Sequence, residues 1–81
     1  MTQDNTRPVA IVTGAARGFG RALTEALLDR DWTVVGDARR GGELEATARA
    51  LDSTQFIPLT GDVADASHRD QLVAAAVDAG H

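Results

Sequence analysis

Apolar and polar residues alternate along the chain in blocks that predict six elements. Three short apolar runs, at residues 9–12, 32–36 and 56–59, are typical of strands buried in a parallel sheet. Apolar residues three and four positions apart indicate helices at residues 21–30 and 43–51 and a last helix after Asp65. The apolar faces predicted for the three helices consist of Leu23, Ala26 and Leu27, of Leu44, Ala48 and Leu51, and of Leu72, Val73, Ala76 and Val77.

This order of strands and helices predicts an α/β fold. The connections are too long for hairpins, so the strands should run parallel and be joined by right-handed crossovers. Pro58 lacks the N–H of a sheet ladder, which places the third strand at an edge. Asp31 can end the first helix in a left-handed conformation, and either Asp65 or Ser67 can cap the last helix.

Composition limits the chain to one small domain and excludes several classes of protein. We divide it into a polar leader, residues 1–7, and a domain, residues 8–81. It has no apolar run long enough to span a membrane, no secretion-signal pattern and no cysteine, so we expect a cytoplasmic protein. The net charge of −4, with Arg39 and Arg40 as the one basic pair, argues against nucleic acid as a partner.

The two histidines give no signal for a metal site. His68 and His81 have no ligating partner at the usual spacing, so we expect no bound metal. We expect His68 to be exposed, because it falls in the first turn of the last predicted helix.

The strongest chemical signal lies between the first strand and the first helix. Thr13 is followed by Gly14, Gly18 and Gly20. Glycine lets the backbone approach a ligand closely, and the following helix directs its unpaired N–H groups and positive dipole end at an anion. The pattern predicts a cradle for a nucleotide phosphate. The alternative is a turn whose glycines serve backbone geometry alone.

The spacing T-G-x-x-x-G-x-G and the later pair Asp62-Val63 resemble the short-chain dehydrogenase/reductase family, over about residues 8–80. The resemblance implies a Rossmann-like three-layer fold with a parallel sheet, here only the first β-α-β-α-β-α portion, in the strand order third, second, first. It also implies a dinucleotide cofactor. Arg17 would contact the adenosine-side phosphate, Asp62 would accept a hydrogen bond from the adenine amino group, and the N–H of Val63 would meet the ring. Phe19 would press on the cofactor or fill the gap between helix and sheet.

The end of the second strand bears on the choice between NADP and NAD. An acid there accepts hydrogen bonds from the adenosine ribose, whereas an arginine binds the 2′-phosphate of NADP. By the resemblance, counting from Gly20, the acid position falls on Ala38 and the basic position on Arg39. Asp37 comes one residue early and should point to the other side of the sheet. Together with Arg17 this favours NADP, but a shift of one residue would return Asp37 to the acid position and favour NAD.

The residues that would catalyse hydride transfer are absent from this sequence. The family's reaction uses a tyrosine, a lysine four residues later and an upstream serine, and the chain has no tyrosine and no lysine. The resemblance thus implies an oxidoreductase acting between NADP(H) and a carbonyl or alcohol, with the catalytic Ser-Tyr-Lys part and the remainder of the domain outside these residues. The alternative is a stand-alone or truncated nucleotide-binding or interaction module without activity, self-associating through the edge of the first strand.

Overall fold

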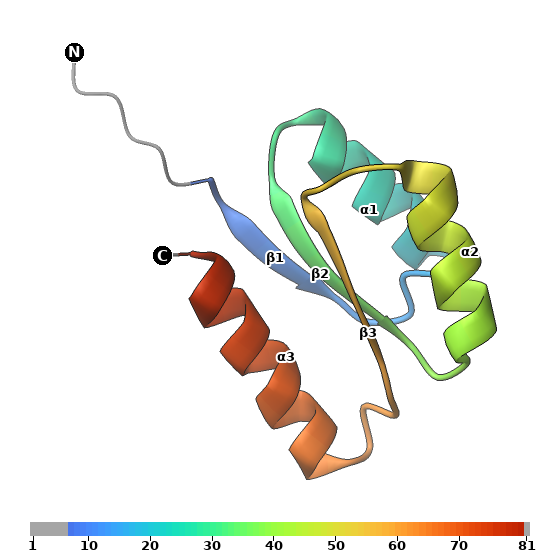
Figure 1. Cartoon of the computed structure of the whole chain (residues 1–81), viewed down its shortest axis with the longest axis vertical. Helices are drawn as coiled ribbons and strands as arrows, with labels where there is room; N and C mark the ends of the chain where they lie inside the picture. Colours follow the sequence, from blue (N-terminus) through green and yellow to red (C-terminus); the bar gives the residue numbers. More distant parts are fainter. Residues whose placement is uncertain (1–6, 81) are drawn as a thin grey trace.

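The computed structural model describes residues 7–80, so residues 1–6 of the predicted leader lie outside the described part. Six elements alternate along the chain (Figure 1): β1 (Val9–Val12), α1 (Gly18–Asp29), β2 (Thr33–Ala38), α2 (Gly41–Leu51), β3 (Phe56–Thr60) and α3 (Ala66–Ala79). The predicted order of elements is confirmed, although α1 begins earlier, inside the glycine turn. Within the described residues, no helix is long and apolar enough to cross a membrane.

The three strands form one parallel sheet in the order β1-β2-β3, as the resemblance implied. In the register, Gly36 of β2 lies between Val12 of β1 and Pro58 of β3. β3 is therefore an outer strand of the described sheet, where the missing N–H of a proline is tolerated. Because the strands are parallel, their carboxyl ends lie together, and the segments after Val12, Ala38 and Thr60 meet at one end of the sheet.

Helices cover both faces of the sheet (Figure 1). α1 and α2 pack on one face, because two successive right-handed crossovers run in the same direction. α3 runs back from β3 over the opposite face and packs against β1 and β2. The chain thus has the predicted Rossmann-like α/β arrangement of three layers.

The face under α1 and α2 carries the main hydrophobic cluster. Its buried members are Val12, Ala15, Val34, Ala38, Leu44 and Phe56. Ala48 and Leu51 pack against this cluster beside Leu44, which confirms the predicted face of α2. The ring of Phe56 lies against Gly36 of β2. This position requires a glycine, since a Cβ at Gly36 would lie 2.5 Å from Phe56 Cε1.

The buried face of α1 is rotated from the predicted one. Leu27 packs against the core as expected, but Ala26 is exposed and Leu23 is 37% exposed. The fully buried position is Thr24, whose hydroxyl donates to the Gly20 carbonyl at 2.8 Å. This hydrogen bond satisfies the hydroxyl group, so a polar residue can occupy a position that a count of apolar residues assigns to solvent.

The buried face of α3 also differs from the predicted one. Leu72 is buried, but Val73 and Val77 are each 56% exposed. The expectation that His68 is exposed is wrong, because only 4% of its surface is accessible. His68 lies one helical turn before Leu72 and shares its face, so the imidazole belongs to the side that meets the sheet.

Acidic residues end α1 and begin α3 as the sequence predicted. Asp31 follows α1 with a left-handed φ of +69°. Asp65 caps α3, since its carboxylate accepts a hydrogen bond from the N–H of Ser67 at 2.9 Å.

Candidate functional site

The turn between β1 and α1 is closed by glycine backbone. Gly14 and Gly18 adopt φ values of +66° and +62°, in the left-handed region that side chains disfavour. Gly20 faces back across the turn, and a Cβ there would collide with the Gly14 carbonyl group. The N–H of Ala15 donates to the Asp37 carbonyl at 2.7 Å and attaches the turn to the end of β2. Backbone geometry therefore accounts for each of the three glycines, whether or not the turn holds a ligand.

α1 begins in this turn without a side-chain cap. Its N-cap residue, Arg17, is extended, and its side chain makes no capping hydrogen bond. The first N–H groups of an α-helix have no partner within the helix. Those of α1 are therefore available to an external acceptor, and the helix dipole favours an anionic one.

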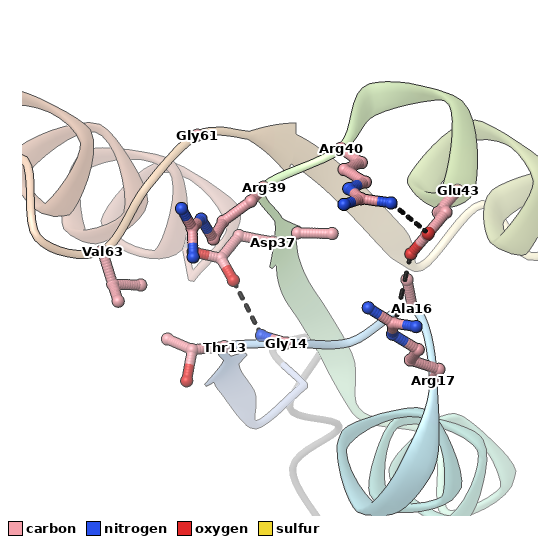
Figure 2. Close-up of a pocket in the computed structure, with 11 residues that line it drawn as sticks. Thr13, Gly14, Ala16, Arg17, Asp37, Arg39, Arg40, Glu43, Gly61 and Val63 are labelled. Atoms are coloured by element: carbon pink, nitrogen blue, oxygen red, sulfur yellow. Dashed lines mark hydrogen bonds and ion pairs between the residues drawn. The ribbon is translucent and has the colours of Figure 1, made fainter.

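A cavity of about 580 Å³ lies beside the turn, at the carboxyl ends of the strands (Figure 2). In open parallel sheets this is the end at which ligands bind. The cavity is lined by Thr13, Gly14, Ala16, Arg17, Asp37, Ala38, Arg39, Arg40, Glu43, Gly61 and Val63. The glycine turn, the end of β2, the start of α2 and the loop after β3 thus meet at one place.

Three arginines border this cavity and are held loosely. Arg17 and Arg40 each approach Glu43 with an N–O distance of 3.8 Å, and Figure 2 shows both guanidinium groups directed at that carboxylate. Arg39 approaches Asp62 at the same distance. Exposed ion pairs of this kind contribute at most about 1 kcal/mol. The three guanidinium groups can therefore turn toward an incoming anion at small cost.

Asp37 is the buried acid of the site, with 2% of its surface accessible. Its Oδ1 accepts a hydrogen bond from the Gly14 N–H at 2.8 Å (Figure 2), and its Oδ2 lies 2.8 Å from Nε2 of His68 on α3. Both carboxylate oxygens thus have partners within the protein. Ala38 points to the other side of β2, into the hydrophobic cluster, as expected from the alternation of side chains along a strand.

The cavity brings together most of the residues predicted to bind a cofactor: Thr13, Gly14, Arg17, Asp37, Arg39 and Val63. Gly18 and Gly20 support the turn without lining the cavity. Asp62 does not line the cavity, although its neighbours Gly61 and Val63 do; its Oδ1 accepts a hydrogen bond from the Ala64 N–H at 2.9 Å. Phe19 is 80% exposed, so the reading in which it fills the gap between helix and sheet is wrong. Its contact with a cofactor stays a prediction.

Several lining residues were not selected from the sequence as cofactor-binding: Ala16, Ala38, Arg40, Glu43 and Gly61. A signal for Glu43 existed, because it lies in the first turn of the helix that follows β2, and a parallel sheet brings that helix start to the glycine turn. No pattern in the sequence pointed to His68, because its partner Asp37 lies 31 positions earlier.

The chemistry of the cavity suits a phosphate-bearing ligand. It offers guanidinium groups and glycine backbone, and the uncapped start of α1 lies in the turn beside it. All of these groups interact favourably with phosphate oxygens. Within residues 7–80, no group of three or more His, Cys, Asp or Glu residues is placed to hold a metal ion.

Comparison with known proteins identifies the family. The profile described as short chain dehydrogenase matches residues 8–80. The chain belongs to this family of oxidoreductases, which use nicotinamide dinucleotide cofactors. One relative, a serine 3-dehydrogenase of Agrobacterium fabrum, is 34% identical over 68 residues, which are 84% of this chain and 27% of that protein.

Solved structures agree with this assignment. Actinorhodin polyketide ketoreductase, solved with NADPH, superposes with a TM-score of 0.82 and 30% identity, over 91% of this chain and 29% of the other. A 3-ketoacyl-(acyl-carrier-protein) reductase from Brucella melitensis, complexed with NADH, gives a TM-score of 0.79 and 25% identity, over 88% and 29%. The chain spans between a quarter and a third of the length of each of these three proteins. Because these two neighbours hold different cofactors, the choice between NADP and NAD must come from this chain's own residues.

Proposed function

We propose that residues 8–81 are part of an NAD(P)-binding domain and hold the adenosine half of NADP(H) in an oxidoreductase acting on a carbonyl or alcohol. The observation that carries the proposal is the cavity in which the glycine turn, the start of α1 and three arginines face one another. The bound nicotinamide supplies the hydride chemistry. The residues of this chain bind and orient the opposite end of the cofactor.

The glycine turn suits the pyrophosphate. A Cβ at Gly14 or Gly18 would have no protein atom within 4 Å, so both positions are open to a ligand. The uncapped N–H groups of α1 supply hydrogen-bond donors for the phosphate oxygens. We assign Arg17, at the start of the helix, to the adenosine-side phosphate, since its long ion pair with Glu43 can be broken at small cost.

The end of β2 favours NADP. We assign Ala38, by the family resemblance, to the position of the ribose-binding acid, and alanine has no carboxylate. The next residue, Arg39, has a side chain that is 79% exposed and lines the cavity, which suits the 2′-phosphate of NADP. Asp37, the acid that would favour NAD, has both carboxylate oxygens engaged by Gly14 and His68.

The loop after β3 suits the adenine ring. Val63 lines the cavity and is 41% exposed, so its backbone can approach a flat ligand. Asp62 uses its Oδ1 within the loop, while among residues 7–80 the one charged group near its Oδ2 is the guanidinium of Arg39, at 3.8 Å. We assign Oδ2 as the acceptor for the adenine amino group and the N–H of Val63 as the contact to the ring.

Calorimetric titration of the 81-residue chain with NADP and with NAD tests the proposal. We expect NADP to bind more tightly. Arg39→Asp should move the ratio of the two affinities toward NAD at least about tenfold, because a charge-assisted contact worth about 1.5–3 kcal/mol is replaced by repulsion. Arg49→Gln removes an exposed arginine outside the cavity and should leave the ratio unchanged. A ratio that Arg39→Asp does not alter would contradict the NADP assignment, and no binding of either cofactor would contradict the site.

We expect no hydride transfer by the chain alone. The tyrosine and lysine of the family's reaction have no counterpart in this sequence. The absorbance of NADPH, followed with a panel of ketones and aldehydes, measures this directly. Turnover by the homogeneous 81-residue chain would show that other residues perform the chemistry.

A second candidate is a nucleotide-binding module without catalytic activity that associates with another chain. The outer edge of β1 has no partner strand within the described sheet, and Ile11 is 40% exposed. Such an edge is a template for further pairing. Light scattering over a range of concentrations measures association, and association would support pairing at the edge of β1. A strict monomer that unfolds in a sharp transition would instead favour a nucleotide-binding module that is independent of other chains.

A further inference from the structure

We propose that Asp37 and His68 form a positioning pair that joins the glycine turn to the loop after β3. The pair rests on the proposed cofactor site, whose two loops it holds together. It acts through the backbone of Gly14 and Gly61 rather than by direct contact with the cofactor. In this proposal Asp37, selected from the sequence as a cofactor ligand, instead supports the turn that carries the ligand.

The carboxylate of Asp37 lies between two hydrogen-bond donors. Asp37 accepts the Gly14 N–H at Oδ1 and lies 2.8 Å from His68 Nε2 at Oδ2. A carboxylate only accepts hydrogen bonds, so the Nε2 of His68 carries the proton and donates. Both side chains are more than nine-tenths buried, and hydrogen bonds to a charged group are strong when water is excluded. The imidazole therefore orients the carboxylate, and the carboxylate orients the N–H of Gly14.

The ring of His68 contacts the backbone of Gly61 in the loop after β3. A Cβ at Gly61 would lie 2.6 Å from both Cγ and Cε1 of the ring and would also collide with Nδ1. The ring thus lies directly against the backbone of the loop, while the Gly61 N–H donates to the Ala38 carbonyl at 3.1 Å. Nδ1 is buried without a partner among the described residues, which fits a ring whose only proton is on Nε2.

The two glycines that the pair contacts lie at the cavity. Gly14 and Gly61 both line it, one in the turn proposed for the pyrophosphate and one in the residues just before the adenine-binding loop. NADP and NAD share these two parts of the molecule and differ only at the 2′-phosphate. Loss of the pair should therefore weaken both cofactors equally, whereas a change at Arg39 should affect their ratio.

Nuclear magnetic resonance of the chain tests the pair without any cofactor. We expect the Gly14 amide proton far downfield, and the His68 ring as the Nε2–H tautomer. Asp37→Asn and His68→Gln should each move the Gly14 amide signal. Gln55→Ala, which removes a partly buried hydrogen bond to the Trp32 carbonyl at the opposite end of the sheet, should not move it. The opposite tautomer in the unaltered chain, or a Gly14 signal that neither variant moves, would overturn the proposal.

Calorimetric titration tests the effect on the cofactor. Asp37→Asn and His68→Gln should each weaken NADP and NAD by the same factor, about tenfold. The double variant should lose little more than either single one, because the residues act as one unit. Folded variants that bind both cofactors with unaltered affinity would make the role of the pair merely structural and overturn the proposal. A changed ratio of affinities would overturn it in favour of a direct contact between Asp37 and the ribose.

A third variant addresses the contact with the loop and avoids a new unpaired buried group. Gly61→Ala should displace the His68 ring, move the Gly14 amide signal and weaken both cofactors. Gly42→Ala is the matched control, since nothing lies within 4 Å of its added Cβ. An unmoved Gly14 signal in Gly61→Ala would overturn the link between the loops. Failure of the unaltered chain to bind either cofactor would contradict the proposed function, while the magnetic resonance experiment would still decide on the pair.

Discussion

The two faces of the sheet bury different sets of side chains. Under α1 and α2 lies a cluster of apolar side chains that includes Val34, Leu44 and Phe56. Under α3, the buried groups include the carboxylate of Asp37 and the imidazole of His68. Apolar contacts are non-directional and follow the area removed from water, whereas hydrogen bonds require matched atoms at fixed geometry. The apolar cluster therefore follows from the spacing of residue types, whereas the Asp37–His68 pair depends on individual partners.

This difference also separates scaffold from site. The apolar face holds helices against strands and reaches the cavity mainly through Ala16 and Ala38. On the other face, Asp37 accepts a hydrogen bond from the glycine turn, and His68 packs against the loop after β3. Changes on the first face should thus alter mainly stability, and changes on the second should alter mainly the cavity.

The largest effect should come from the apolar face. Leu44 is 1% exposed inside the cluster, so Leu44→Ala should lower the free energy of unfolding by about 2–5 kcal/mol. Leu72→Ala, on the α3 face, should cost less because Leu72 is not part of that cluster. Urea unfolding of both variants measures the difference, with the exposed Glu45→Ala as control. Equal losses would mean that the two faces contribute similar apolar packing.

An intermediate effect should come from the glycine turn. Gly20→Ala places a Cβ against the Gly14 carbonyl and should cost about 1–3 kcal/mol of stability, because neither backbone segment can yield without opening the turn. Cofactor affinity should fall as well. Thermal unfolding and titration measure both quantities. Gly42→Ala, in open space on α2, should instead leave stability unchanged or raise it by up to about 1 kcal/mol. Normal binding by Gly20→Ala would show that the turn adapts more readily than its close contact implies.

The smallest effect should come from the outer side of α3. Val73 is 56% exposed, so Val73→Ser should change the free energy of unfolding by no more than about 0.5 kcal/mol. Denaturant unfolding at two protein concentrations measures it. A larger loss that depends on concentration would indicate that a second chain covers this side of α3 in solution.

Sequence reasoning succeeded where one residue type at a regular spacing decided the outcome. Leu44, Ala48 and Leu51 mark the buried face of α2, and Pro58 marks an outer strand. It failed where a polar residue was buried. Thr24 is buried because its hydroxyl bonds to the preceding turn of the same helix, an option that apolar periodicity does not register.

The candidate site divides in the same way. Thr13, Gly14, Arg17 and Arg39 were selected from the sequence and line one cavity. Their cofactor-binding roles stay predictions. Glu43 was not selected, because its place beside the arginines depends on how α2 docks on the sheet.

The sequence by itself determined the alternation of strands and helices and the glycine turn, because both depend on neighbours within a few positions. Only the tertiary structure decided which groups Asp37 meets. Its partners, Gly14 and His68, lie 23 and 31 positions away. Gly14 meets it because β1 pairs with β2, and His68 meets it because α3 runs back over the sheet after β3. A carboxylate at the end of a strand can accept hydrogen bonds from a ligand or from donors of the protein. Its surroundings in three dimensions set which of the two it meets, since a buried charge must find hydrogen-bond partners wherever the fold supplies them.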